Sequence, residues 1–214
     1  MLQPSISFSG FTLHEPVTVL TDLILSGFCL FLSFKTGKSH AKFWSAFFLT
    51  MSFATFIGAL GHGLYIDKNN ILQWISRTAG IVSVFWGEIA SAMMLLKNRI
   101  RSLLVILISL QLAVAIAFIL QRNEFKVVVT NGTIGFGVIV ALIQIYLILK
   151  GHLGSKYILG GIAVNAVAGL IHKFQVAPSK WFNHNDLGHV IMIFGLFLIA
   201  KGALYFQHNE KEND

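Results

Sequence analysis

Seven long apolar stretches constrain the fold of this chain more than any other feature of its sequence. They cover residues 16–34, 42–66, 72–96, 101–121, 126–149, 155–174 and 184–206. A bilayer core about 30 Å thick is crossed by roughly 20 mostly apolar helical residues. Lipid offers no hydrogen-bond partner to the backbone, so helices suit these stretches best. We therefore expect an all-α fold, a polytopic bundle of seven transmembrane helices that forms one domain over residues 1–214.

Composition supports a membrane protein and argues against a nucleic-acid-binding one. The 214 residues are 55% hydrophobic and only 12% charged, with a mean hydropathy of +0.73, which lies outside the range of ordinary soluble domains. The net charge of +7 comes from short clusters of Lys and Arg between the apolar stretches, whereas nucleic-acid binding favours one basic face. We therefore expect membrane lipids as partners and no nucleic acid.

The distribution of positive charge predicts the orientation in the membrane. Ten Lys and Arg residues lie on the side that holds the first, third and fifth connections and the C-terminal end. Five lie on the opposite side, where the N-terminal segment has none. Because cytoplasmic segments are enriched in Lys and Arg, we expect the N-terminus outside and the C-terminus in the cytoplasm.

Small residues predict a close contact between two of the helices. The sixth stretch contains Gly160, Gly161 and Gly169, and the fifth contains Gly132 and Gly135. In membranes, small residues let the backbones of two helices approach closely. We therefore expect the fifth and sixth helices to pack backbone to backbone.

Polar and ionisable residues gather near the predicted outer ends of the stretches. Such groups cost free energy in a membrane unless they are paired, hydrated or bound to a metal. A single histidine at this depth is ordinarily an interfacial residue, but several together favour a site. The group comprises His14, Glu15, Asp22, His62, Arg77, His172, His184, Asp186 and His189. At about 1.5 Å of rise per residue, the members inside the stretches form one layer less than roughly 10 Å deep.

Two parts of this layer contain residue types that bind catalytic zinc. Such a zinc commonly takes three protein ligands from His and carboxylate groups, and its fourth position holds a water whose pKa falls to about 7. His62 from the second stretch, His189 from the seventh, and either Asp186 or His184 can supply that set. The sequence therefore predicts a zinc site between the second and seventh helices.

Helix geometry separates the candidate ligands of the seventh stretch. Asp186 and His189 are three residues apart and share a helix face, whereas His184 and His189 are five apart and point in different directions. Asn183 or Asn185 is a suitable helix cap. We therefore expect His184 to reach the site from a non-helical segment before the helix.

Two further pairs of ionisable residues match in depth. Glu88 on the third stretch and Lys201 on the seventh each lie about 25 Å from the outer end at the same rise. We expect them to form a buried structural ion pair, with a proton or ion relay as the alternative. Asp22 and Arg77 also match in depth. Here a structural pair competes with a role for Asp22 as a base or in orienting a metal-bound histidine.

The position of His62 and the sequence NDLGH at residues 185–189 resemble features of a known superfamily. Alkaline ceramidases and progestin/adipoQ receptors are seven-helix membrane proteins that hold zinc with a His on the second helix and a His-x-x-x-His motif on the seventh. Their known activity is hydrolysis of lipid amides. The resemblance implies that His62 and His189 bind zinc, with Asn185 at the first motif position and Gly58 where the superfamily has Ser. The stretch HNDLGHVIM is also similar to a group of bacterial seven-helix proteins, which implies a bacterial inner membrane.

Two classes of function are compatible with these features. The first is a zinc-dependent hydrolase of lipid amides or esters, in which Asp22 or Glu15 accepts the proton of the attacking water. The second is a non-enzymatic receptor or sensor, or a transporter of small solutes or protons. In that class the outer cluster binds a ligand or senses pH, because histidine titrates near about pH 6.5.

Overall fold

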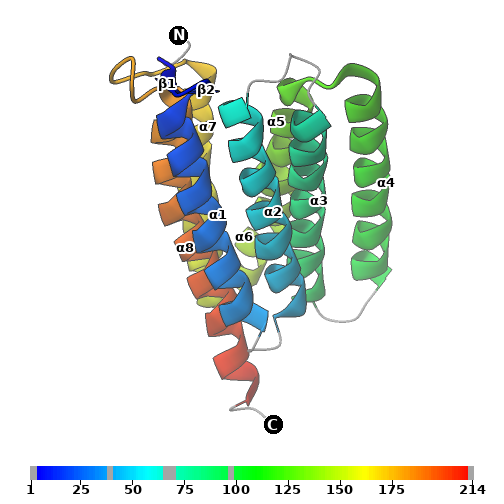
Figure 1. The fold of residues 1–214 in the computed structure, drawn as a ribbon. Coiled ribbons are helices and arrows are strands. Elements are labelled where there is room, and N and C mark those ends of the chain that lie inside the picture. The colour runs from blue at the N-terminus through cyan, green and yellow to red at the C-terminus, as the bar shows by residue number, and fades with distance from the viewer. Residues whose placement is uncertain (1–3, 38–40, 65–70, 96–98, 212–214) are drawn as a thin grey trace.

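Helices make up almost all of the structure, a computed structural model that describes residues 4–37, 41–64, 71–95 and 99–211 (Figure 1). The helices are α1 (Pro16–Gly37), α2 (Lys42–Leu64), α3 (Ile71–Met93), α4 (Arg99–Arg122), α5 (Phe125–Ile134), α6 (Ala141–Leu149), α7 (Gly154–Lys173) and α8 (His184–Lys211). A π-helical segment, η1 (Gly135–Val140), joins α5 and α6 into one continuous helix. The expected all-α class is confirmed over these residues.

Each predicted apolar stretch coincides closely with one helix or, for the fifth, with the continuous helix from α5 to α6. The predicted ends of the second and third stretches, at residues 66 and 96, lie outside the described residues. By length and composition, six helices are able to cross a membrane, namely α1, α2, α4, the α5–α6 helix, α7 and α8. The protein is therefore a multi-pass helical membrane protein. The helix α3, which carries Arg77 and Glu88, is not among the six, and its crossing stays a prediction.

The helices pack in an order that closes a ring. α1 packs against α2 and α8, α2 also packs against α3, and α7 packs against α8. α3 contacts α4 and η1, and α6 contacts α7. Figure 1 shows α4 at the edge of the bundle, next to α3. The ring places the start of α1 beside the end of α2 and the start of α8.

A short β-hairpin precedes α1 and was not predicted from the sequence. Strand β1 (Ile6–Phe8) pairs antiparallel with β2 (Phe11–Leu13), and the hairpin lies at one end of the bundle (Figure 1). The N–H of His14 donates a hydrogen bond to the carbonyl oxygen of Gly63 at 3.1 Å. This bond ties the hairpin to the end of α2 and places Glu15 beside that helix.

Glycines spaced seven residues apart bring α7 and α8 together. A Cβ added to Gly161 would lie 2.5 Å from the carbonyl oxygen of Gly195, and one added to Gly202 would lie 2.5 Å from that of Gly154. Gly135, in the fifth stretch, faces side chains of α3 instead. The predicted contact between the glycines of the fifth and sixth helices is therefore wrong. The sixth stretch forms α7, and its small face meets α8 because both helices repeat glycine with the same spacing.

Candidate functional site

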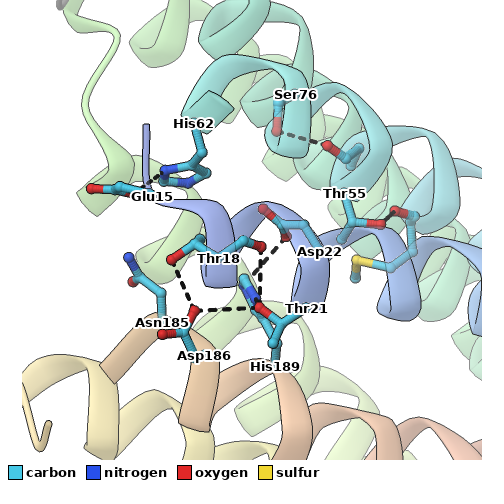
Figure 2. Close-up of polar contacts among 12 residues, drawn as sticks. Glu15, Thr18, Thr21, Asp22, Thr55, His62, Ser76, Asn185, Asp186 and His189 are labelled. Carbon is cyan, nitrogen blue, oxygen red and sulfur yellow. Dashed lines mark hydrogen bonds and ion pairs between the residues drawn. The ribbon is translucent and has the colours of Figure 1, made fainter. Parts of the chain in front are cut away.

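Five ionisable residues from α1, α2 and α8 come together at the end of the bundle that carries the hairpin (Figure 2). Glu15 directly precedes α1, Asp22 lies on α1, His62 lies in the last turn of α2, and Asp186 and His189 lie near the start of α8. We call these five residues the end cluster. Because α1 packs against both α2 and α8, α1 is the element that joins the members of the cluster.

The first contact of the end cluster joins Glu15 to His62. Glu15 Oε2 lies 2.6 Å from His62 Nδ1. Glu15 has a φ of 43°, a left-handed backbone conformation that costs free energy in a residue other than glycine. The hydrogen bond from His62 lowers the pKa of Glu15, which lies outside the membrane-spanning helices. The hairpin and this bend in the backbone therefore hold a carboxylate against the end of α2.

Acid is expected to weaken the contact between Glu15 and His62. Because folding lowers the pKa of Glu15 below its ordinary value of 4.5, the contact stabilises the folded protein above that pH. This contribution is lost as the pH falls through the lowered pKa. Glu15→Gln should therefore reduce the free energy of unfolding by about 1 kcal/mol at neutral pH. The variant and the wild type should melt alike at a pH near about 2.

Thermal unfolding of the purified protein across this pH range provides the measurement. Glu124→Gln, at the exposed connection between α4 and α5, is the matched control and should follow the wild-type curve. A constant difference in melting temperature between Glu15→Gln and wild type at every pH would contradict the prediction.

The second contact of the end cluster joins Asp22 to His189. Asp22 Oδ1 lies 3.4 Å from His189 Nε2, and His189 Nδ1 lies 3.0 Å from the hydroxyl of Thr21. Both ring nitrogens of His189 therefore face groups on α1. The side chain of Asp22 is 6% exposed and that of His189 is 18% exposed. A change of charge at this contact therefore takes place in a largely buried environment, where it has a large effect on packing.

Asp186 has a structural role that the sequence did not predict. Its Oδ1 accepts hydrogen bonds from Thr18 at 2.8 Å and Thr21 at 3.4 Å, and its Oδ2 accepts one from the backbone N–H of Asn183 at 2.7 Å. The Asn183 side chain accepts in turn from the N–H groups of Asn185 and Asp186. This reciprocal arrangement is a capping box, so the predicted cap at Asn183 is confirmed. Asp186 caps α8 and also ties it to α1.

His184 lies within α8 and packs against α7. The helix begins at His184, and the centroid of its ring lies 5.1 Å from that of His172 on α7. The expected non-helical position of His184 is therefore wrong. Asn183 caps the helix one residue earlier, so His184 is already helical and cannot share the face of His189, which lies five residues further on.

The predicted zinc ligands are not gathered around one point. Among the described residues, no group of three or more His, Cys, Asp or Glu side chains is placed to hold a metal ion. His62 contacts Glu15, Asp186 accepts bonds from α1 and from the helix cap, and His184 contacts His172. The structure therefore does not gather these residues into a zinc site, and the zinc cofactor stays a prediction.

The predicted ion pair between Glu88 and Lys201 is wrong. Lys201 Nζ lies 4.2 Å from the centroid of the Tyr157 ring. Glu88 is 1% exposed and lies against Gly135 at the start of η1. Equal depth does not bring the two side chains together, because α3 packs against α2, α4 and η1 while α8 packs against α1 and α7.

Of the two alternatives for Asp22, the structure does not show the ion pair with Arg77. Arg77 donates hydrogen bonds to the backbone and side-chain oxygens of Asn123, and to Gln73 Oε1 at 3.0 Å. Asp22 contacts His189 instead. The guanidinium therefore links α3 to the connection between α4 and α5.

Ser76 on α3 lies near Asp22 of the end cluster, and the sequence did not indicate this. Its hydroxyl donates a hydrogen bond to the carbonyl oxygen of Ala54 at 2.8 Å. A Cβ added to Gly58 would lie 3.3 Å from Ser76 Oγ and 3.6 Å from Asp22 Oδ2. The glycine therefore leaves room for the side chains of Ser76 and Asp22 to approach each other. The sequence does not indicate that α3 packs next to α2 at this position.

The threonines of α1 carried a signal that could have been read. Thr18 and Asp22 are four residues apart and Thr21 is adjacent to Asp22, so all three lie on one face of α1. Ser26 and Ser33 continue this buried polar face along the helix. A search for polar residues at helical spacing inside an apolar stretch would have selected the threonines together with Asp22.

The apolar helices and the end cluster define a multi-pass helical membrane protein with a partly buried polar site at one end. Residues 17–208 match a family described as a family of unknown function (DUF6962), and the chain belongs to this family. The match contains Asp22, His62, Asp186 and His189, and it begins after Glu15. No curated protein and no solved structure matches the chain.

Proposed function

We propose that this chain is a proton-responsive membrane sensor whose end cluster takes up protons from the outer side. One observation carries the proposal. Two histidines each contact a carboxylate, at 2.6 Å for His62 and Glu15 and at 3.4 Å for His189 and Asp22. The two contacts connect α1 to different helices, so the protonation of either histidine acts on how α1 packs.

The chemistry of the two contacts supports a response near neutral pH. Histidine is the side chain whose ordinary pKa lies in this range. A protonated histidine next to a carboxylate forms an ion pair, which is stronger in a poorly hydrated environment than in water. Other ionisable groups lie close enough to interact electrostatically with these contacts. They are Asp186 within the cluster, His14 and His184 near Glu15, and His172 near His189. Proton uptake should therefore tighten the contacts of α1 with α2 and α8.

The proposal includes seven crossings, with the N-terminus outside and the C-terminus in the cytoplasm of a bacterial inner membrane. α3 has 23 residues, enough to cross the roughly 30 Å hydrocarbon core. It packs against α2 and α4, which are both long and apolar enough to cross. Its acidic residue Glu88 is buried. Membrane lipids are then the partners of the exposed apolar surface.

A spin-label distance between α1 and α8 tests the sensor. Labels replace the exposed Leu20 and Val190, in a Cys29→Ala background and in lipid nanodiscs. Lowering the pH from about 7.5 to about 5.5, across the ordinary pKa of histidine, should shorten and narrow the distance distribution. His189→Gln should remove most of this change.

The control is His152→Gln, in the exposed connection between α6 and α7, which should respond like the wild type. His62→Gln should remove the corresponding response between labels on α1 and α2. A wild-type distance distribution that is identical at both pH values would refute the sensor.

A zinc-dependent hydrolase of lipid amides or esters is the second candidate, and a specific observation favours it. In both His62 and His189, Nδ1 lies within 3.0 Å of an oxygen, from Glu15 and Thr21 respectively. Histidines that bind metal through one ring nitrogen commonly have the other held by such an oxygen. His62 and His189 would hold the ion, and bound zinc would supply an acidified water. Asp22 or Glu15 would accept the proton.

Metal analysis of the purified protein separates the two candidates. About one equivalent of zinc per chain, lost in both His62→Ala and His189→Ala, would favour the hydrolase. The sensor predicts far less than one equivalent, together with the pH-dependent distance change.

A further inference from the structure

Glu88 is a buried acid toward the C-terminal end of α3, outside the end cluster. It is 1% exposed, and its Oε1 accepts no hydrogen bond from the described residues. Within the part of the chain that the structure describes, no Lys, Arg or His side chain forms an ion pair with it. A carboxylate in such surroundings is costly to keep ionised.

The π-helical segment η1 lies against this carboxyl group. A Cβ added to Gly135, the first residue of η1, would lie 2.9 Å from Glu88 Oε1 and 2.5 Å from Val84 Cγ1. Only glycine therefore lets the backbone of η1 approach α3 this closely. The backbone of Gly135 and the side chain of Val84 leave this side of the carboxyl too crowded for the several oxygen ligands that a metal cation needs. Short π-helical segments within α-helices often occur at functional sites.

Uncharged polar residues lie on α3, α4 and the α5–α6 helix in the same part of the bundle as Glu88. Gln111 on α4 lies close enough to Glu88 to interact with its carboxyl group, and it donates a hydrogen bond to Asn131 Oδ1 at 3.2 Å. One turn along α3, Ser91 accepts a hydrogen bond from Gln144 Nε2 at 3.1 Å. The Oε1 of Gln144 is buried and accepts no hydrogen bond from the described residues. These residues form a polar seam between α3, α4 and the α5–α6 helix, without a charged neighbour among those that contact Glu88.

We propose that Glu88 is a second proton-binding site, an exchangeable carboxylic acid inside the bundle that is protonated at neutral pH. A neutral carboxyl removes the cost of a buried charge, which matters here because no cation among the described residues pairs with Glu88. This site does not depend on the end cluster, because the two share no residue. Glu88 lies on α3, whereas the end cluster is formed by α1, α2, α8 and the residue before α1.

Infrared spectroscopy of the protein in nanodiscs tests the proposal directly. The wild type should show the C=O stretching band of a buried protonated carboxyl at neutral pH, and the band should shift in D₂O. Raising the pH should remove the band. Glu88→Gln should abolish it completely, whereas Glu124→Gln, at the exposed connection between α4 and α5, should leave it unchanged.

A second readout shows whether a missing band reflects misfolding. Glu88→Gln has the shape and neutrality of the protonated acid, so it should melt like the wild type. Gly135→Ala keeps Glu88 but presses a methyl group against its carboxyl, and this variant should shift the band. The variants His62→Gln and His189→Gln should retain the band, so this test succeeds or fails independently of the sensor.

Three infrared results and one thermal result would overturn the proposal. The wild type could lack the band at neutral pH, the band could persist in Glu88→Gln, or it could remain at every pH at which the protein stays folded. If sodium raised the melting temperature of the wild type but not of Glu88→Gln, Glu88 would instead be an ionised ligand of a cation.

Discussion

Gly161→Ala is expected to destabilise the protein by about 3 kcal/mol or more, at the upper end of the usual cost of overpacking. The added methyl group would lie 2.5 Å from the carbonyl oxygen of Gly195, 2.7 Å from Ile199 Cγ1 and 3.1 Å from the backbone nitrogen of Ile199. Two of these atoms belong to the backbone of α8 and cannot rotate away. The two helices must therefore separate, which also moves the start of α8 relative to α1.

The neighbouring residue provides the matched control. A methyl group on Gly160 would meet only Leu198 Cδ1, at 3.9 Å, which is an ordinary contact. Gly160→Ala should therefore stabilise the helix by up to about 1 kcal/mol, because alanine is the better helix former. Thermal unfolding of purified protein in one detergent compares the two. Equal effects of the two substitutions would mean that α7 and α8 do not pack at this distance.

Asp186→Ala should cause a loss of similar size through a different mechanism. The carboxylate accepts hydrogen bonds from the hydroxyls of Thr18 and Thr21 and from the backbone N–H of Asn183. A buried donor deprived of its acceptor costs about 1 to 3 kcal/mol, and the helix cap adds about 1 kcal/mol. We therefore expect the free energy of unfolding to fall by about 4 kcal/mol.

Two further substitutions identify the source of this loss. Asp186→Asn keeps one oxygen for the threonines but cannot also accept from Asn183, so it should cost about half as much. Asn185→Ala, one residue earlier and on a half-buried part of α8, should change stability by less than about 0.5 kcal/mol. The prediction fails if Asp186→Ala unfolds at the same temperature as Asn185→Ala.

The end cluster was predicted in part because depth is a property of a single helix. Asp22, His62 and His189 lie at similar distances from the ends of their own helices, and a constant rise per residue is enough to show this. The contact between Glu15 and His62 depends in addition on the hairpin and on the left-handed backbone of Glu15. The Ser9-Gly10 pair between two short alternating runs was a signal for the hairpin, whereas the backbone conformation of Glu15 has no such signal.

Errors arose wherever a prediction needed to know which way a helix faces. Glu88 and Lys201 match in depth but lie on helices that pack against different neighbours. Arg77 contacts Asn123 and Gln73, not Asp22. The glycines of the sixth stretch meet α8, not the fifth helix. In each case the rotation of a helix about its axis depends on long-range packing, which residue spacing along one helix does not contain.

The sequence by itself determined that the chain forms apolar helices, approximately where each begins and ends, and that its polar groups gather near one end. These properties follow from the length of each apolar stretch and from the rise of an α-helix, both of which are local. The tertiary structure decided which side chains meet. It engaged Asp186 in a cap and a link to α1, turned His184 toward His172, and paired His62 and His189 with carboxylates. Such contacts depend on the packing of α1 between α2 and α8, and that packing is the outcome of interactions over the whole bundle.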